Sequence, residues 1–141
     1  MRRRNPPPPE TPEFFTDRGL GKRVVEGLRA EGWTIHAMFE VYPSSERSRS
    51  RRFQDENWIP AVTERGWVIL SKDGFRLHHE RLAIADCDAR VFMLPNASIR
   101  TEQMIERFAV SKEAIWAHCN EAGLLYAVHP TTLFHITLPE L

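Results

Sequence analysis

Apolar residues recur along this chain at two spacings, one typical of strands and one typical of helices. Short apolar or alternating runs predict strands at 13–16, 33–38, 67–70 and 90–94. The end of the chain, 124–138, also has strand character, and Pro130 marks a turn within it. Apolar residues three or four positions apart predict helices over 18–31, 55–65, 76–86 and 101–121, the last one interrupted. Residues 39–53 are predicted to be a polar loop.

Strands that alternate with helices predict an α/β protein. Such strand-helix-strand units join parallel strands by right-handed crossovers. The run Trp67–Leu70 is apolar throughout, as expected for a strand that is buried on both faces of a parallel sheet. We therefore expect a three-layer α/β/α sandwich with a mainly parallel central sheet.

Composition narrows the class of protein. The chain has 141 residues, of which 42% are hydrophobic and 27% charged, and its 19 basic and 19 acidic residues cancel. This balance is typical of a soluble globular domain and excludes a highly basic protein such as a histone. No apolar run approaches the roughly 18 residues of a membrane helix, and prolines follow the first arginines where a signal peptide would be apolar. We expect a cytoplasmic protein that does not contact a membrane.

The run of prolines near the start of the chain indicates where the folded domain begins. Pro6–Pro9 lack backbone donors and favour an extended polyproline conformation. We expect residues 1–12 to be a disordered Pro-rich arm and residues 13–141 to form one domain.

Cys87 and Cys119 stand far apart in the sequence, which excludes a disulfide scaffold and a zinc site built from cysteines. Both cysteines are expected to be small buried residues.

Acidic residues flank two of the predicted strands. Asp17 ends the first strand, Asp73 follows strand 67–70, and Asp55 and Glu56 open the helix that leads into that strand. In open α/β sheets, ligands bind outside the carboxyl ends of the strands. The helix over 55–65 precedes its strand, so we expect its first residues to reach that edge only through the preceding loop. Clustered carboxylates repel one another unless a cation neutralises them. Mg²⁺ or Mn²⁺ would do so, and such a site suits phosphodiester hydrolysis.

Each of these acids also has a purely structural interpretation. Asp17 would suit the N-cap of helix 18–31, and Asp55 and Glu56 would suit the first turn of their helix. Asp73 and Gly74 form a turn-favouring pair. The spacing alone does not decide between the structural and the functional interpretation.

Three segments in order carry a resemblance to a known family: Phe14-Phe-Thr-Asp-Arg-Gly-Leu-Gly21, Asp55-Glu56-x-Trp58 and Gly66-Trp-Val-Ile-Leu-Ser-Lys-Asp73. Together they resemble the PIN-like nucleases, in particular the VapC-type toxins, whose core reads D-[RE]-x-L-G, D-E-x-[WI] and [TS]-K-D. The likeness runs from about residue 13 to 137. It implies a PIN-like fold, dependence on Mg²⁺ or Mn²⁺, endoribonuclease activity on RNA, and an antitoxin protein that restrains the toxin.

The resemblance also implies roles for individual residues. Asp17, Asp55 and Asp73 match the metal-ligating carboxylates, and Glu56 is a supporting or alternate ligand. A fourth acid is common in the family, but the candidates here, Glu80, Asp86 and Asp88, do not align cleanly.

Basic residues near the acids are the expected RNA contacts. The segment before Asp55 carries four arginines within six positions, Arg47, Arg49, Arg51 and Arg52, and Lys72 precedes Asp73. Guanidinium and ammonium groups beside a metal site would hold RNA phosphates. The alternatives are a solvated loop for the arginines and an ordinary surface position for Lys72.

Two other classes of function stay open at this point. One is a non-catalytic PIN-like module that binds nucleic acid or a protein partner. The other is a phosphoacceptor receiver-like domain, which fits less well because such domains place paired acids after the first strand. The absence of a P-loop and of a G-x-G-x-x-G motif argues against NTP hydrolysis and dinucleotide binding. Homodimer formation is left open, with the four tryptophans expected in the core or at a dimer interface.

Overall fold

The computed structural model describes residues 11–42, 55–95 and 98–141, with the side chains of 55–57 outside the description. Twelve helices and strands are described in those ranges. In chain order they are β1 (Glu13–Thr16), α1 (Gly21–Ala30), β2 (Thr34–Ala37), α2 (Met38–Val41), α4 (Asp55–Glu64), β3 (Val68–Ser71), α5 (His78–Asp86), β4 (Arg90–Met93), α6 (Thr101–Val110), α7 (Lys112–His118), β5 (Leu124–Val128) and β6 (Leu133–His135).

The strands form one sheet in the order β2-β1-β3-β4-β5-β6. The first five strands are parallel to their neighbours, and β6 returns antiparallel to β5. Phe15 of β1 lies between His36 of β2 and Ile69 of β3. The sheet is therefore mainly parallel, as predicted.

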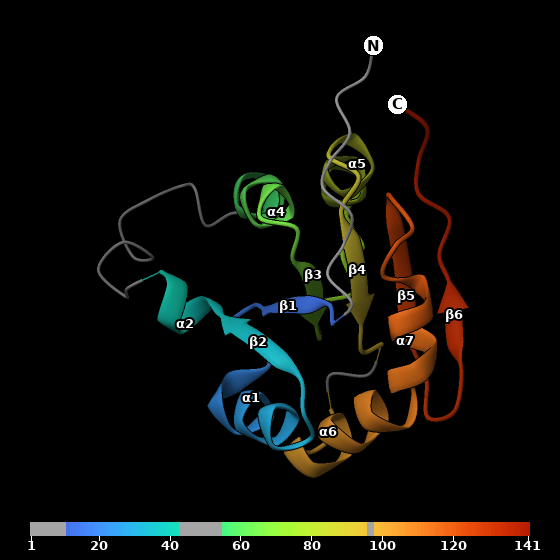
Figure 1. Ribbon diagram of the computed structural model, residues 1–141. Coiled ribbons are helices and arrows are strands. Elements are labelled where there is room, and N and C mark those ends of the chain that lie inside the picture. Colours follow the sequence, from blue (N-terminus) through green and yellow to red (C-terminus); the bar gives the residue numbers. More distant parts are fainter. Residues whose placement is uncertain (1–10, 43–54, 96–97) are drawn as a thin grey trace.

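Helices cover both faces of the sheet (Figure 1), with α4 and α5 above it in that view and α1 and α6 below. Successive side chains of β1 point to opposite faces of the sheet and pack against different helices. Phe14 belongs to the cluster formed with α1, α6 and α7, whereas Phe15 belongs to the cluster formed with α4 and α5. Both phenylalanines are fully buried. The three-layer α/β/α sandwich predicted from the sequence is confirmed.

Several element boundaries differ from the prediction. The helix after β1 begins at Gly21 instead of residue 18, because the backbone first turns at Asp17, whose carboxylate accepts the Gly19 N–H. Residues 38–41 form the short helix α2, although residue 38 was predicted to end a strand and 39–41 to be loop, and Met38, its first residue, is buried. The interruption predicted within helix 101–121 is confirmed and lies at Ser111, a buried residue whose backbone leaves the helical conformation.

Helix α4 runs parallel to α5, and both descend toward the amino edge of the sheet. The C-terminal end of α4 meets the start of β3, where the Trp67 N–H donates to the Val62 carbonyl. The same end lies beside the end of α5, since Thr63 Oγ1 and Cys87 Sγ are 3.9 Å apart. A ten-residue helix is about 15 Å long, so the first turn of α4 points toward the carboxyl edge of the sheet. The helix itself brings Asp55 and Glu56 toward that edge, and the expected detour through the loop is not needed.

Three further predictions concern the cysteines, a membrane helix and the Pro-rich arm. Cys119 is buried and Cys87 is half-buried, and both carry free thiols. Within the described ranges, no helix has the length and apolar character needed to cross a membrane. The predicted Pro-rich arm lies mostly in residues 1–10, which are outside the described part of the chain.

Candidate active site

Asp17 follows β1 directly and is held by hydrogen bonds from two directions. The Gly19 N–H donates to Asp17 Oδ1 at 3.1 Å, and the Ser71 hydroxyl donates to Asp17 Oδ2 at 2.5 Å. Ser71 is the last residue of β3 and is fully buried. Because both carboxylate oxygens accept a bond from the protein, the orientation of Asp17 is fixed before any ligand arrives.

Asp73 lies two residues beyond Ser71, in the loop that leads to α5. Its N–H donates to Ser71 Oγ at 2.9 Å, and its Oδ1 accepts the Phe75 N–H at 2.8 Å. Phe75 is fully buried and has a φ of 48°, a left-handed conformation that is costly for an aromatic residue. The loop is thus shaped at both ends, by the hydroxyl of Ser71 and by the anchored ring of Phe75.

The electrostatic environment of Asp17 disfavours its negative charge. Burial raises the pKa of Asp17 to about 6, and the nearby charge of Asp73 also raises it. The hydrogen bonds from Ser71 and Gly19 and the charge of Arg18 lower the pKa, but they do not offset the burial. A group with this balance is stabilised by a proton or by a cation placed beside it.

Asp17, Ser71 and Asp73 lie where the order of the strands reverses direction in the sheet. From β1 the chain adds β2 on one side, and β3 then pairs with β1 on the other side. In α/β sheets of this kind, the crevice outside the carboxyl ends at such a reversal is where ligands bind. Asp17 comes from one of the two strands that flank the crevice, and Ser71 and Asp73 come from the other.

Lys72 joins this group through its contact with the β1–α1 loop. A Cβ built on Gly19 would lie 3.3 Å from Asp17 Oδ1 and 3.4 Å from Lys72 Cγ. The lysine stem therefore packs across the loop directly beside the Asp17 carboxylate. A glycine at position 19 leaves the room that this close approach needs.

The structure places only some of the predicted site residues close to one another. Asp17, Asp73 and Lys72 gather at the carboxyl edge of β1 and β3. Asp55 and Glu56 form the first turn of α4, but their side chains lie outside the description, and Arg47, Arg49, Arg51 and Arg52 fall outside the described residues altogether. Among the residues that are described, no group of three His, Cys, Asp or Glu side chains could hold a metal ion.

The structure tests whether Asp17 and Asp73 have the purely structural roles of a helix cap and a turn residue. Asp17 does not cap α1, because the N-cap is Leu20 and no side chain caps it, so that interpretation is wrong. The turn interpretation of Asp73 is confirmed by its bond from Phe75.

Two of the three candidates for a fourth acid lie away from the site, and the third is bonded within its own helix. Glu80 Oε1 accepts the Leu77 N–H at the start of α5. Asp86 ends α5 and Asp88 precedes β4, so both lie toward the opposite, amino edge of the sheet.

Sequence reasoning missed one residue that organises the site. Ser71 was expected only to be part of the Ser-Lys-Asp motif, with no role of its own. The available signal was strand alternation, because Ser71 shares the face of Ile69 and lies beside the end of β1. A buried hydroxyl at that position needs a partner, and Asp17 supplies one.

The fold and the arrangement of these residues define an α/β protein with two acidic side chains, Asp17 and Asp73, at the reversal point of a mainly parallel sheet. The family model described as "PIN like domain" matches residues 12–96, more than half of the chain. The chain is also 32% identical over 127 residues to a curated protein of Mycobacterium tuberculosis (strain ATCC 25618 / H37Rv) named "Putative ribonuclease VapC45". The alignment covers 87% of this chain and 90% of that protein.

The chain belongs to the PIN-like domain family. The resemblance to PIN-like, VapC-type proteins that the sequence motifs suggested is confirmed by both comparisons. No solved structure matches the chain.

Proposed function

We propose that this protein is a metal-dependent endoribonuclease that hydrolyses phosphodiester bonds in RNA, and that it is the toxin of a toxin–antitoxin pair in the cytoplasm. The observation that carries the proposal is the Asp17 carboxylate, which accepts a hydrogen bond from Ser71. Burial and the nearby charge of Asp73 both disfavour the negative charge of this carboxylate. Membership of the PIN-like family and the name of the mycobacterial relative support the same function.

The residues proposed to hold Mg²⁺ or Mn²⁺ are Asp17, Asp55 and Asp73, with Glu56 in support. The donor set fits a hard cation, because carboxylate oxygens are the ligands such ions prefer. Asp17 fits in a second respect, since a divalent cation would relieve both the burial of its charge and the repulsion from Asp73. When bound, the cation would activate a water molecule and stabilise the charge on the scissile phosphate.

Other groups of the protein would orient the metal-binding carboxylate and bind the charged phosphates of the RNA. Ser71 and Gly19 each use one acceptor position on an Asp17 oxygen, and an ionised carboxylate has further acceptor positions for a ligand. The Lys72 ammonium, whose stem lies beside Asp17, is proposed to bind a phosphate of the RNA backbone. The arginines 47, 49, 51 and 52 are proposed to extend this contact along the strand, because phosphate contacts position nucleic acid without reading its sequence.

The test compares RNA cleavage by the full chain and three variants in Mg²⁺, in Mn²⁺ and in EDTA. Asp17→Asn and Asp73→Asn remove one candidate ligand each, and Asp86→Asn is the matched control at the opposite edge of the sheet. We expect cleavage by the wild type and by Asp86→Asn only when a metal is present, and a loss of at least a hundredfold in the two site variants.

Binding of Mn²⁺, measured by calorimetry, separates the possible failures. A folded protein that binds Mn²⁺ through Asp17 and Asp73 but cleaves no RNA would be a non-catalytic PIN-like binding module. A folded protein that neither binds Mn²⁺ nor cleaves RNA would refute the proposal. Cleavage that survives Asp17→Asn would refute the assignment of the site.

A further inference from the structure

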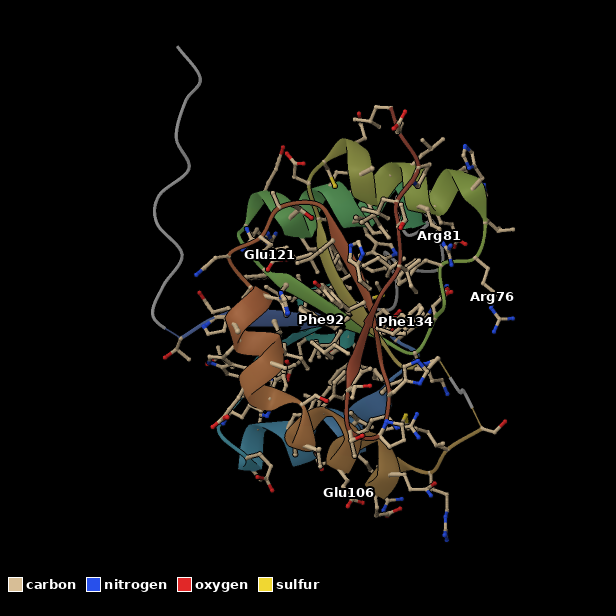
Figure 2. The ribbon with its side chains drawn as sticks, turned by 90° about the vertical axis from the view of Figure 1, so that its right-hand side faces the viewer. Arg76, Arg81, Phe92, Glu106, Glu121 and Phe134 are labelled. Carbon is tan, nitrogen blue, oxygen red and sulfur yellow. The ribbon has the colours of Figure 1, made fainter. Side chains whose placement is uncertain are left out.

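Two arginines, Arg76 and Arg81, lie beside the loop that carries Asp73. Arg76 belongs to this β3–α5 loop, residues 72–77, and Arg81 lies in the first turns of α5. Figure 2 shows the two side chains on the same side of the molecule. Neither is among the RNA contacts proposed above, which are Lys72 and the arginines that precede Asp55. The groups that each guanidinium contacts indicate what it can bind.

Arg81 is held in place by the backbone of the β3–α5 loop. Its Nε–H donates to the Phe75 carbonyl at 2.7 Å, and its side chain is half-buried. Phe75 is anchored in turn, because its ring is fully buried and its N–H donates to Asp73 Oδ1 at 2.8 Å. The backbone of Phe75 therefore positions the Arg81 guanidinium and the Asp73 carboxylate relative to each other.

The Arg81 guanidinium keeps most of its capacity to donate hydrogen bonds. A guanidinium carries five N–H donors in a planar fork. Within the described ranges of the chain, only the Nε–H of Arg81 is used, and its two Nη groups have no hydrogen bond or ion pair. Because Nε is fixed, these donors point in a set direction. Such a fork suits a bidentate contact with a phosphate.

Arg76 packs back over the same loop. A Cβ built on Gly74 would lie 3.3 Å from Arg76 Nε and 3.4 Å from Arg76 Cγ, so the arginine side chain passes directly beside the residue that follows Asp73. The side chain is exposed, and it has no hydrogen bond or ion pair with any residue that the structure describes. Its positive charge is therefore available to an anionic ligand at the β3–α5 loop.

Positive groups thus reach Asp73 from two directions. Lys72 packs against Gly19, on the side of β1, whereas Arg81 contacts the loop from α5. A single small anion could not contact both sides at once. A nucleic-acid strand could, because it carries a phosphate at every nucleotide and phosphate contacts are what position a strand on a protein.

We infer that Arg76 and Arg81 bind a backbone phosphate of the RNA on the α5 side of Asp73, next to the bond that is cleaved. The inference rests on the proposed function, since it takes RNA as the ligand of this site. Arg81 would bind the phosphate through its Nη donors, and Arg76 would add a second positive charge. With Lys72 on the other side, the strand is held on both sides of the carboxylates, which favours cleavage within a strand.

The first test measures binding of a fluorescent single-stranded RNA to the full chain in EDTA, by anisotropy at several salt concentrations. The logarithm of the affinity falls with the logarithm of the salt concentration by roughly 0.7 for each phosphate contact. Arg76→Ala should weaken binding severalfold and reduce the slope by about that amount. Arg65→Ala is the matched control, because Arg65 is exposed just before β3, at the opposite edge of the sheet, and should keep the wild-type slope.

The second test separates phosphate binding by Arg81 from support of the loop. Arg81→Lys keeps the charge but loses the planar fork, so binding should weaken severalfold at an unchanged slope. Arg81→Ala loses both, and its slope should fall as that of Arg76→Ala does. A merely structural role would lower the stability to urea and the affinity for Mn²⁺ and leave the salt slope unchanged. That result would overturn the role of Arg81.

RNA cleavage in Mn²⁺ distinguishes a failure of this inference from a failure of the proposed function. A wild type that cleaves RNA, with equal slopes in wild type, Arg76→Ala and Arg81→Ala, would overturn only the assignment of the arginines. So would a wild type that cleaves RNA but binds none in EDTA, because arginine contacts need no metal. A wild type that binds RNA with the expected slopes and cleaves none would uphold the contacts and refute the proposed function. A wild type that neither binds nor cleaves would overturn both.

Discussion

The Ser71 hydroxyl joins the carboxyl ends of β1 and β3 by donating to Asp17 Oδ2 while it accepts the N–H of Asp73. One buried side chain thus sets the orientation of one candidate ligand and the backbone that carries the other. Groups that orient metal ligands are commonly worth ten- to a hundredfold in metal affinity. Ser71 is accordingly a positioning residue for the proposed metal site.

Ser71→Ala should weaken Mn²⁺ binding by about ten- to a hundredfold, because Asp17 Oδ2 and the Asp73 N–H both lose their hydrogen-bond partner. Ser71→Thr keeps the hydroxyl and should recover most of the binding. Calorimetry with Mn²⁺ measures both variants without depending on RNA cleavage. Binding in Ser71→Ala equal to that of the wild type would show that Ser71 has no such role.

Asp17 should make the metal-free protein less stable as the pH rises. Its pKa in the folded state, about 6, lies above the unfolded value, so the folded state favours the protonated form. That contribution is fully present below the unfolded pKa, near pH 4, and is lost as the pH rises through 6. In EDTA at pH 7.5, Asp17→Asn should be more stable than the wild type by on the order of 1–3 kcal/mol.

Urea unfolding at pH 7.5 and at pH 4 measures this difference, which should vanish at the lower pH. Asp86→Asn, at the opposite edge, is the control and should follow the wild type at both values. Added Mn²⁺ should reverse the order at pH 7.5, because only the wild type keeps the full set of proposed ligands. An Asp17→Asn variant less stable than the wild type at pH 7.5 in EDTA would contradict the account of Asp17.

Phe75 should be the residue of the site loop on which folding depends most. It is fully buried among side chains of the α4 and α5 layer, and truncation of a buried phenylalanine costs about 3–5 kcal/mol. Phe75→Ala should therefore unfold at a much lower urea concentration. Leu77→Ala, at an exposed position two residues further on, should change stability by less than about 0.5 kcal/mol.

Substitutions of Gly19, in the β1–α1 loop, and of Gly21, at the start of α1, should separate effects on metal binding from effects on stability. Gly21 has a φ of 76° with open space around it, so Gly21→Ala should cost about 1 kcal/mol of stability and leave Mn²⁺ binding unchanged. Gly19→Ala adds a methyl group against Asp17 and Lys72, and should weaken Mn²⁺ binding severalfold with little change in stability. Thermal unfolding and calorimetry measure the two effects, and the reverse pattern would refute the assignment.

Most of the fold could be predicted from local sequence. The apolar run before Ser71 and the alternation after Gly32 identified β3 and β2, and the rule on carboxyl ends brought Asp17 and Asp73 to one edge. The role of Ser71 could not be predicted, because its partner Asp17 is remote in sequence and becomes a neighbour only through the pairing of β1 with β3. Helix α2 was also missed: it has only four residues, and its contact with α1 through the Arg29–Glu40 ion pair at 2.5 Å cannot be predicted from the local pattern.

The hydrogen bond between Ser71 and Asp17 spans 54 positions of the chain. Contacts of such length form only after the entropy of closing a long loop has been overcome, and they therefore come late in folding. During synthesis, the first strand and its helix emerge well before β3 exists to orient the carboxylate. A partly made or locally unfolded chain in which β1 and β3 are not paired would lack the oriented carboxylate, so the orientation of Asp17 would depend on the pairing of these two central strands.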